Sequence, residues 1–381
     1  MAKNYKEDGV NIDAGDAFSR FCNKINQSTY GNSPYVEILD FSQGNFRGPK
    51  GFLFKNLPEG CIETGAVDGI GTKVAVIVAS GRVRSSASNV IAMTAMDITR
   101  WGGLPLLFMN ILDVHSLGEF ESGLYRSYED IMVGLRRICD VHKFVSFTGE
   151  TAEIGLCVGS EISDSDIKFN WGGVMMGVYH PDKMILGSTL APGQIIMALQ
   201  DLFRSNGFSS VRRAFFMKYG PQWWLNPDAM EDIIDAAEGS AQYDRFFNTL
   251  HGWFNAPSFK PLVQMHLIVH LSGGAFKSKL AEDILQKSGL SAEITDLFSP
   301  LPIMKKCAEW RRMSHEECYE TWNGGQGVIA VIDPQDEEFF IGMAEKFGIN
   351  AKRAGKITKK KKYNVRIRSM FDDNKKKFIE Y

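Results

Sequence analysis

The chain has 381 residues, which is too long for one ordinary hydrophobic core, so two domains are expected. A hydrophobic fraction of 44%, a charged fraction of 23% and a formal charge of -2 are typical of a globular protein and give no global reason to bind nucleic acid or a membrane. No apolar run could span a bilayer, no secretory signal is seen, and the six scattered cysteines are expected to be reduced thiols, so a cytoplasmic location is expected.

The first half of the chain predicts an arm followed by an α/β domain. Residues 1–60 are rich in Gly, Asn, Ser and Pro with weak periodicity, which indicates an extended arm. An N-terminal α/β domain is expected over 61–180. Strands are predicted at 61–67, 72–80, 104–114, 143–150 and 168–180, and helices at 86–103 and 121–142.

The second half predicts an α+β domain at 194–357, after a turn-rich linker at 180–194. Strands are predicted at 195–200, 265–274, 291–298 and 325–333, and helices at 208–220 and 275–289, whereas 219–262 has no clear assignment. The basic tail at 358–381 carries "KKKK" (359–362) and "KKK" (375–377), and such lysine runs are usually solvated and disordered.

The stretch "GAVDGIGTK" (65–73) combines a carboxylate, two glycines, a hydroxyl and an ammonium. It is not a Walker A loop or a GxGxxG turn, but Gly69 and Gly71 allow main-chain N–H groups to approach an anion, and Lys73 adds a charge. Asp68 would repel a phosphate unless Mg²⁺ lies between them. A tight turn with solvated Asp68 and Lys73 remains the structural alternative.

Two further acidic positions extend the hypothesis of a metal site. Asp97 lies late in the apolar helix predicted at 86–103, where an unpaired carboxylate would be costly to bury. Glu150 lies in "TGETAE" (148–153), near the end of a predicted strand, where a helix-capping role is the alternative. Asp68, Asp97 and Glu150 are therefore predicted to converge on one or two Mg²⁺ ions that bridge a triphosphate.

Glycine turns in the second half are candidate phosphate sites. Asn206-Gly207 and Ser272-Gly273-Gly274 each lie between a predicted strand and a predicted helix, and the N-termini of helices bind anions. His270 ends a strand, where a structural role competes with proton transfer. Asn323, in "WNGGQGV", could bind a ligand or cap a turn.

In order along the chain, these motifs resemble the aminoimidazole ribonucleotide synthetase family, also called phosphoribosylformylglycinamidine cyclo-ligase. The resemblance rests on one list of segments: "YKEDGVNIDAGD" (5–16), "VDGIGTK" (67–73), "AMDITRWGGLP" (95–105), "TGETAE" (148–153), "SNG" (205–207), "HLSGGA" (270–275) and "WNGGQGV" (322–328). It runs from about Tyr5 to about Ile357. The opening segment is its most specific part.

The resemblance implies a two-domain α/β (α+β) fold, in which the N-terminal sheet pairs into a barrel across a homodimer and the C-terminal domain is an α+β sandwich. The implied reaction uses ATP and Mg²⁺ to close formylglycinamidine ribonucleotide into aminoimidazole ribonucleotide, in de novo purine biosynthesis, through an iminophosphate. Neither nucleic acid nor a membrane is an implied partner.

The resemblance also implies a role for each motif. Asp68, Asp97 and Glu150 would bind the metal, with Glu150 also orienting substrate, and the Gly69–Thr72 main chain and Lys73 would contact ATP. Asn206, Gly207, Ser272, Gly273, Gly274 and Asn323 would hold the substrate, and His270 would transfer a proton.

The chain departs from the family at several positions. The family usually has Asn-Asp where this chain has Met96-Asp97, and a family histidine is replaced by Arg204, which could still meet a phosphate. The usual TGGG is "SGGA" here, and Gly324 replaces a cysteine or methionine.

These departures keep two alternatives open: another ATP-dependent phosphorylating enzyme of the superfamily acting on a different acceptor, or a catalytically inactive homologue with a binding role. A third, nucleic-acid binding by the tail, lacks interleaved aromatic residues.

Overall fold

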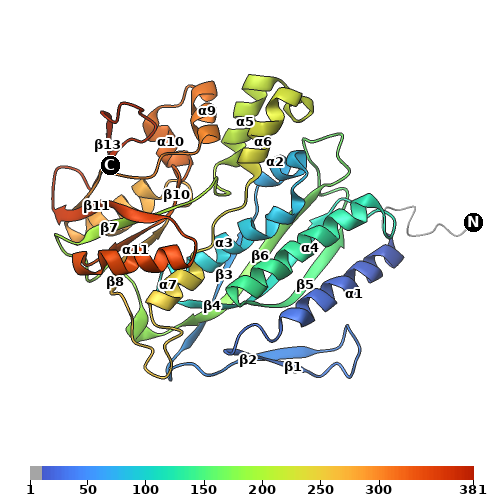
Figure 1. Ribbon diagram of the computed structural model, residues 1–381. Coiled ribbons are helices and arrows are strands. Elements are labelled where there is room, and N and C mark those ends of the chain that lie inside the picture. The colour runs from blue at the N-terminus through green and yellow to red at the C-terminus, as the bar shows by residue number, and fades with distance from the viewer. Residues whose placement is uncertain (1–10) are drawn as a thin grey trace, which may run out of the picture. The chain divides into compact units, whose positions relative to one another are not determined.

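The structure is a computed structural model that describes residues 11–381, so residues 5–10 of the opening motif lie outside the described part (Figure 1). The chain divides into two compact units. Unit 1 comprises Met1–Ile98 and Leu104–His180, and unit 2 comprises Thr99–Gly103 and Pro181–Tyr381. Within residues 11–381, no helix has both the length and the apolar character needed to cross a membrane.

Unit 1 is built on a four-stranded sheet in the order β3-β6-β4-β5. Its strands are β3 (Ile62–Gly69), β4 (Leu104–Val114), β5 (Val145–Glu153) and β6 (Phe169–Tyr179). Strands β4 and β5 are parallel, whereas β6 is antiparallel to both β3 and β4. The register places Asp68, Gly173, Asn110 and Gly149 in one row across the sheet.

Two predicted helices of unit 1 are confirmed as α3 (Ser86–Thr99) and α4 (Gly123–His142). Helix α4 begins where the Ser122 hydroxyl accepts a hydrogen bond from the Tyr125 N–H, and it buries an apolar stripe that includes Leu135 and Cys139. The predicted strand at 72–80 is wrong, because the chain turns at Gly71 with φ 63° and forms helix α2 (Lys73–Ser80). A short, fully buried apolar run has no period that separates a strand from a helix.

The interpretation of residues 1–60 as an extended arm is also wrong for the described part. Helix α1 (Ile12–Thr29) is followed by an antiparallel hairpin of β1 (Val36–Asp40) and β2 (Lys50–Phe54). Asn11 caps α1 by accepting a hydrogen bond from the Ala14 N–H, and Phe18 and Ile25 are buried along the same helix. Polar residues between the apolar positions hide this spacing in the sequence.

Unit 2 is built on a seven-stranded sheet in the order β13-β12-β9-β11-β7-β10-β8. Its strands are β7 (Ile195–Gln200), β8 (Met265–His270), β9 (Leu290–Ile294), β10 (Gln326–Ile332), β11 (Ala351–Lys359), β12 (Val365–Arg368) and β13 (Phe378–Glu380). The predicted strands at 195–200, 265–274, 291–298 and 325–333 correspond to β7, β8, β9 and β10. One continuous apolar core joins this sheet to the π-helix Phe276–Leu285.

The remaining helices of unit 2 include the predicted α5 and several that the sequence left unassigned. They are α5 (Phe208–Tyr219), α6 (Met230–Ala237), α7 (Asp244–Leu250), α8 (Gln286–Ser288), α9 (Pro302–Arg311), α10 (His315–Thr321) and α11 (Glu337–Lys346). Helices α6 and α7 belong to the segment 219–262.

The lysine-rich tail is ordered, contrary to the expectation of disorder. Strand β12 pairs in parallel with β9, and β13 completes that edge of the sheet. Val365 and Ile367 are completely buried, whereas the lysines at 359–362 and 375–377 are exposed, at the end of β11 and in the loops around β12. Alternating buried positions on β12 therefore anchor the segment, and its lysines are solvated.

Candidate active site

The turn after β3 leads from Asp68 into helix α2, and its Ile70 N–H donates a 3.0 Å hydrogen bond to the Trp171 carbonyl. Asp68 is half-buried and its Oδ1 accepts a 2.7 Å hydrogen bond from the Gly69 N–H. Gly71 turns the chain into α2, whose first residue is Lys73. The Lys73 side chain is fully buried, and its Nζ donates a 3.0 Å hydrogen bond to Asn89 Oδ1 on α3. The ammonium thus lies beneath the turn rather than on its surface.

The three predicted metal ligands do not form one cluster within the described part of the chain, where no group of three or more His, Cys, Asp or Glu side chains could hold a metal ion. Asp68 and Glu150 lie on strands at opposite edges of the sheet, and three strand spacings separate them by about 14 Å. Asp97 lies eight residues beyond Asn89 on α3, about 12 Å along the helix axis. Strand order, which local sequence does not reveal, separates Asp68 from Glu150.

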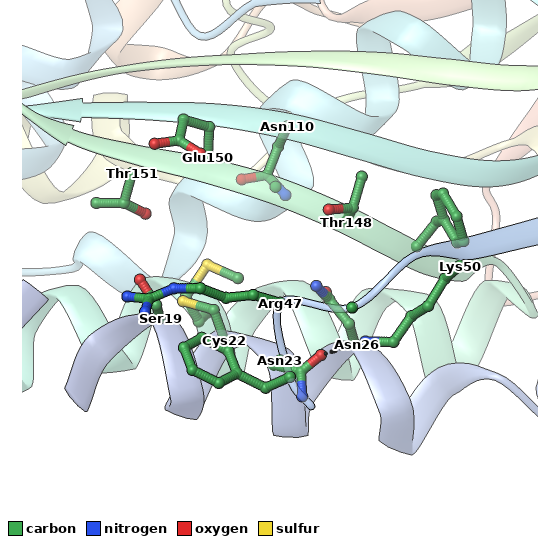
Figure 2. A pocket seen from close by; sticks show the side chains of 15 residues that line it. Ser19, Cys22, Asn23, Asn26, Arg47, Lys50, Asn110, Thr148, Glu150 and Thr151 are labelled. Atoms are coloured by element: carbon green, nitrogen blue, oxygen red, sulfur yellow. Dashed lines mark hydrogen bonds between the residues drawn. The ribbon is translucent and has the colours of Figure 1, made fainter. Parts of the chain in front are cut away.

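"TGETAE" instead lines a cavity of about 440 Å³ that lies wholly within unit 1. Figure 2 shows β5 on one side, with Thr148, Glu150 and Thr151, and α1 on the other, with Ser19, Cys22 and Asn23. Arg47, from the loop before β2, and Lys50, the first residue of β2, extend between them. Burial raises the pKa of the Cys22 thiol to about 12, which keeps it neutral.

Hydrogen bonds hold the two cations of this cavity in place. Lys50 Nζ donates a 2.8 Å bond to Asn23 Oδ1, and Arg47 pairs with Asp16. Sequence reasoning missed both cations. The signal available was "NFRGPK", in which two basic residues flank a Gly-Pro turn.

Asn110 supplies an unpaired donor to the same cavity. Its Oδ1 accepts a 3.1 Å hydrogen bond from Trp171 Nε1, but its Nδ2 is buried without a hydrogen-bond partner among the described residues, and the side chain is 6% exposed. A Cβ at Gly149 would lie only 2.7 Å from this nitrogen. The glycine therefore keeps space open beside a donor that needs an acceptor.

The second glutamate of "TGETAE" has a structural role. Glu153 Oε1 accepts a 2.7 Å hydrogen bond from the Leu117 N–H, and Oε2 accepts a 2.9 Å bond from the Asn11 N–H. It ties the start of α1 to the loop after β4.

In unit 2, the three predicted glycine loops do meet. Strand β10 lies between β7 and β8 and runs antiparallel to both, so the segments after β7 and β8 and before β10 share one end of the sheet. A Cβ at Gly207 would lie 2.6 Å from the Thr321 carbonyl, and one at Gly273 would lie 3.3 Å from the same oxygen. Asn323 Nδ2 donates a 3.0 Å hydrogen bond to the Leu202 carbonyl.

Polar atoms at this meeting point lack partners. Asn323 is 4% exposed and its Oδ1 is buried without a hydrogen bond among the described residues, as is Asn206 Oδ1. Gly273 is exposed, so its main chain is accessible, and Gly274 has a φ of 70°. The arrangement fits a ligand that offers both donors and an anionic group.

Arg204 does not meet this site as a phosphate ligand, which corrects the expectation from the sequence. It is 1% exposed, its Nε lies 3.0 Å from Asp201 Oδ2, and Nη2 donates to the Ala241 carbonyl at 3.3 Å. Its guanidinium lies over the Tyr243 ring. The residue that replaces the family histidine is thus part of the core.

His270 is also fully buried at the end of β8, and this burial argues against direct proton transfer to a substrate. Its carbonyl accepts a hydrogen bond from Lys279, a cation on the π-helix that sequence reasoning missed. The signal was "SGGAFKSK", which places lysines just after the glycine turn.

Comparison with known proteins first defines the class. The sequence model of the AIR synthase related protein C-terminal domain matches residues 258–368, which include two of the three loops. Escherichia coli HypE, a hydrogenase maturation protein, shares the fold with a TM-score of 0.55 and 13% identity over 92% of this chain and 93% of HypE. A HypE structure in complex with ATP gives a TM-score of 0.50 and 13% identity over 81% and 79%. The protein has the fold of the AIR synthase-related class.

Curated relatives then narrow the class. The phosphoribosylformylglycinamidine cyclo-ligase of Rippkaea orientalis is 26% identical over 361 residues, covering 93% of this chain and 96% of the relative. That of Staphylococcus carnosus is 24% identical over 370 residues, covering 94% and 96%. The resemblance found in the sequence is confirmed: the chain is a divergent relative of the phosphoribosylformylglycinamidine cyclo-ligases over nearly its full length.

Proposed function

We propose that this chain is an ATP-dependent cyclo-ligase that converts formylglycinamidine ribonucleotide to aminoimidazole ribonucleotide in purine biosynthesis. The carrying observation is the full-length relationship to the cyclo-ligases. It is supported by the meeting of the three predicted substrate loops at one end of the unit 2 sheet.

The chemistry explains why ATP is required. An amide oxygen is a poor leaving group, so ATP phosphorylates the formyl oxygen to give an iminophosphate and ADP. The amidine-derived nitrogen of the same molecule then attacks that carbon, closes the five-membered ring and expels phosphate. Because both reacting groups belong to one bound molecule, the closure gains from high effective molarity. The chain's main task is to position the substrate and stabilise charge on the transferred phosphoryl group.

For ATP, unit 1 offers two anion-binding features. We assign the phosphates to the Gly71–Thr72 part of the predicted Gly69–Thr72 main chain, because the Gly69 and Ile70 N–H groups already donate to Asp68 Oδ1 and the Trp171 carbonyl. The buried Lys73 ammonium would stabilise negative charge from beneath the turn. The cavity beside β5, with Arg47, Lys50 and the unpaired Asn110 Nδ2, is the second feature. HypE, whose fold this chain shares, has been solved in complex with ATP.

Mg²⁺ fits this assignment as an ion that arrives with ATP and is bound by one carboxylate, and not as a centre of three carboxylates. A single-chain centre of Asp68, Asp97 and Glu150 does not fit the described residues. An ion that accompanies ATP usually needs one or two carboxylates plus phosphate oxygens, and Asp68 beside the glycine turn is the proposed ligand. We derive no chemical step from a metal centre.

The substrate is proposed to bind to unit 2. Asn206 and Asn323 would meet its polar groups, and the turn Ser272-Gly273-Gly274 its ribose phosphate.

A homodimer is proposed from the exposed face of the unit 1 sheet. Val67 on β3 is 73% exposed and Ile111 on β4 is 55% exposed, although both lie within strands. A second copy of this face would cover these side chains. Light scattering of wild type and Val67→Glu measures the mass, and a monomeric wild type would refute the proposal.

The test of function is ADP release by the purified chain with ATP and Mg²⁺, with and without formylglycinamidine ribonucleotide. Asp68→Asn should abolish release, whereas the exposed Asp235→Asn should leave it unchanged. Lys50→Met separates the two ATP assignments: a normal KM for ATP supports the glycine turn, and a KM raised at least tenfold supports the cavity.

One alternative has a specific observation in its favour. Arg204 is locked in the core, and Met96, which replaces a polar family residue, is 1% exposed. No ADP release from a folded wild type that still binds ATP would favour a catalytically inactive homologue with a binding role.

A further inference from the structure

The C-terminal segment 358–381 concentrates positive charge in a chain that is otherwise acidic. It contains nine Lys or Arg residues and three Asp or Glu residues, a formal charge of +6, whereas the whole chain has a formal charge of -2. Residues 1–357 therefore carry a formal charge of -8. None of the motifs on which the family resemblance rests lies in this segment. Such a separation of charge favours a surface that meets a polyanion.

The structure arranges this charge along the two-stranded ribbon of β12 and β13. Val365 and Ile367 are buried in the apolar core of unit 2. Arg366 and Arg368 alternate with them along β12, so both guanidinium groups lie on the face of the strand that points away from the core. Strand pairing places Phe378 of β13 opposite Arg368, on the same face.

Exposed lysines lie at both ends of this ribbon. Those at 359–362 run from the end of β11 into the loop before β12, and those at 375–377 lie in the loop before β13. The Ser369 N–H donates a 2.9 Å hydrogen bond to the Lys377 carbonyl, so the second group follows the end of β12 directly. Together with Arg366 and Arg368, these lysines form a basic stripe. Because six residues separate Lys362 from Arg368, these two lie at most about 20 Å apart.

Carboxylates neutralise only part of the basic stripe. Glu380 lies 3.3 Å from Arg366 Nε and 4.0 Å from Lys362 Nζ. Asp373 pairs with a lysine of α9, and Asp372 accepts hydrogen bonds from main-chain N–H groups of its own loop. Within residues 11–381, several cations of the stripe form no ion pair: Arg368, Lys359, Lys361, Lys375, Lys376 and Lys377.

Aromatic rings on the ribbon distinguish between classes of polyanion. The Arg366 guanidinium lies 4.1 Å from the centre of the Phe378 ring and 5.9 Å from that of Tyr363, and the Arg368 guanidinium lies 5.5 Å from that of Phe378. Strand pairing thus supplies the interleaving of aromatic and basic residues that the sequence does not show. Unpaired bases stack on aromatic rings and on guanidinium planes. The aliphatic side chains of β12 and β13 are buried, which disfavours insertion into a membrane.

We propose that the basic stripe binds single-stranded nucleic acid with little sequence preference. The lysines contact phosphates, and the guanidinium groups beside Phe378 support unpaired bases. A strand with one phosphate about every 3.4 Å places about six phosphates along 20 Å, which matches the cations that form no ion pair. The proposal does not rest on the proposed function, because the stripe contains none of the residues assigned to ATP or substrate.

The test is the fluorescence anisotropy of a labelled single-stranded RNA of about 12 nucleotides, titrated with the full chain. About six phosphate contacts predict that the logarithm of the affinity falls against the logarithm of the salt concentration with a slope of about -4. The affinity should therefore fall roughly 250-fold between about 50 and 200 mM salt.

A triple variant, in which glutamine replaces the lysines at 375–377, tests the location of the contacts. Its affinity at low salt should fall at least tenfold, and its salt slope should flatten by about 2. The control removes the same charge from three exposed lysines elsewhere in unit 2: Lys218→Gln, Lys260→Gln and Lys287→Gln. It should bind RNA as wild type does.

Arg368→Lys separates stacking from charge. This variant keeps the positive charge but loses the guanidinium plane, so it should weaken single-stranded RNA binding severalfold at an unchanged salt slope. A duplex of the same sequence should bind more weakly to wild type and should not respond to this substitution, because its bases are already stacked.

Four results would overturn the proposal. They are no salt-dependent RNA binding by wild type, equal affinity of wild type and the 375–377 variant, equal losses in the two triple variants, and no effect of Arg368→Lys. Binding of poly-glutamate, or of vesicles that contain phosphatidylserine, without binding of RNA would assign the stripe to an acidic protein or a membrane and would likewise overturn it.

Discussion

Loss of the buried Asp201–Arg204 pair should destabilise unit 2 severely. Both side chains are at most 1% exposed, and Asp201 Oδ1 also accepts 2.8 Å hydrogen bonds from the N–H groups of Leu202 and Ala241. Arg204→Met fills similar volume but leaves the Asp201 carboxylate buried without its cation. Removal of one partner of a buried pair costs about 3–5 kcal/mol, because the remaining charge stays desolvated.

A double-mutant cycle makes this prediction specific. Asp201→Asn should destabilise by a similar amount, whereas Asp201→Asn combined with Arg204→Met should cost much less than the sum, with a coupling of about 1–3 kcal/mol. An exposed pair gives the control: Arg84→Met, which breaks the pair with Asp130, should change stability by less than about 1 kcal/mol.

Urea unfolding followed by tryptophan fluorescence measures these changes. Trp171 lies in unit 1, and the other six of the seven tryptophans lie in unit 2, so the signal reports mainly on the unit that holds the pair. A loss below about 1 kcal/mol for Arg204→Met, or full additivity in the double variant, would refute the core role of Arg204. Either result would make Arg204 a candidate phosphate-binding residue again.

Three further predictions concern stability. Burial lowers the pKa of His251 from 6.5 to about 4. Because the folded-state pKa lies below the unfolded value, stability should fall by about 3 kcal/mol as the pH falls from about 6.5 toward 4. Melting curves at several pH values should show this loss, and the same loss in His251→Gln would contradict the assignment to His251. Gly207→Ala would place a Cβ 2.6 Å from the Thr321 carbonyl, at a backbone φ of 77°, and should destabilise unit 2. The control Gly220→Ala, which also has a positive φ but no atom within 4 Å of the added Cβ, should destabilise less, and equal urea midpoints for the two variants would be evidence against the meeting of the loops. Ile367→Ala on β12 should cost about 2–5 kcal/mol in urea unfolding, and no loss would mean that the tail is not part of the sheet.

The sequence predicted most of the sheet strands because their composition is distinctive. The apolar run at 104–114, which has four leucines, matches β4 from end to end. The prediction failed at α2, which is short and has five of its eight residues buried, so its apolar run shows no clear period of 3.6. It failed at the tail because exposed lysines in the loops around β12 outnumber the few buried residues that hold the strand.

Some parts of the candidate site could likewise be predicted from the sequence, whereas others could not. The loops around Asn206, Ser272 and Asn323 were predicted as ligand sites from their glycine turns and from the family resemblance. They meet in the structure because strands β7, β8 and β10 are neighbours. The cluster of Asp68, Asp97 and Glu150 was predicted from residue type, from local position in the predicted elements and from the family resemblance, whereas strand order places two of them at opposite edges of a sheet. Arg47, Lys50 and Lys279 were missed because their partners are distant in the sequence or their roles depend on side-chain direction.

The most direct test of the central claim is the conversion of formylglycinamidine ribonucleotide to aminoimidazole ribonucleotide by the purified chain with ATP and Mg²⁺, followed by chromatography and mass spectrometry. The account predicts one aminoimidazole ribonucleotide and one phosphate for each ADP released, and no product with Asp68→Asn. A folded chain that hydrolyses ATP without forming this product, or that leaves both substrates unchanged, would contradict the account.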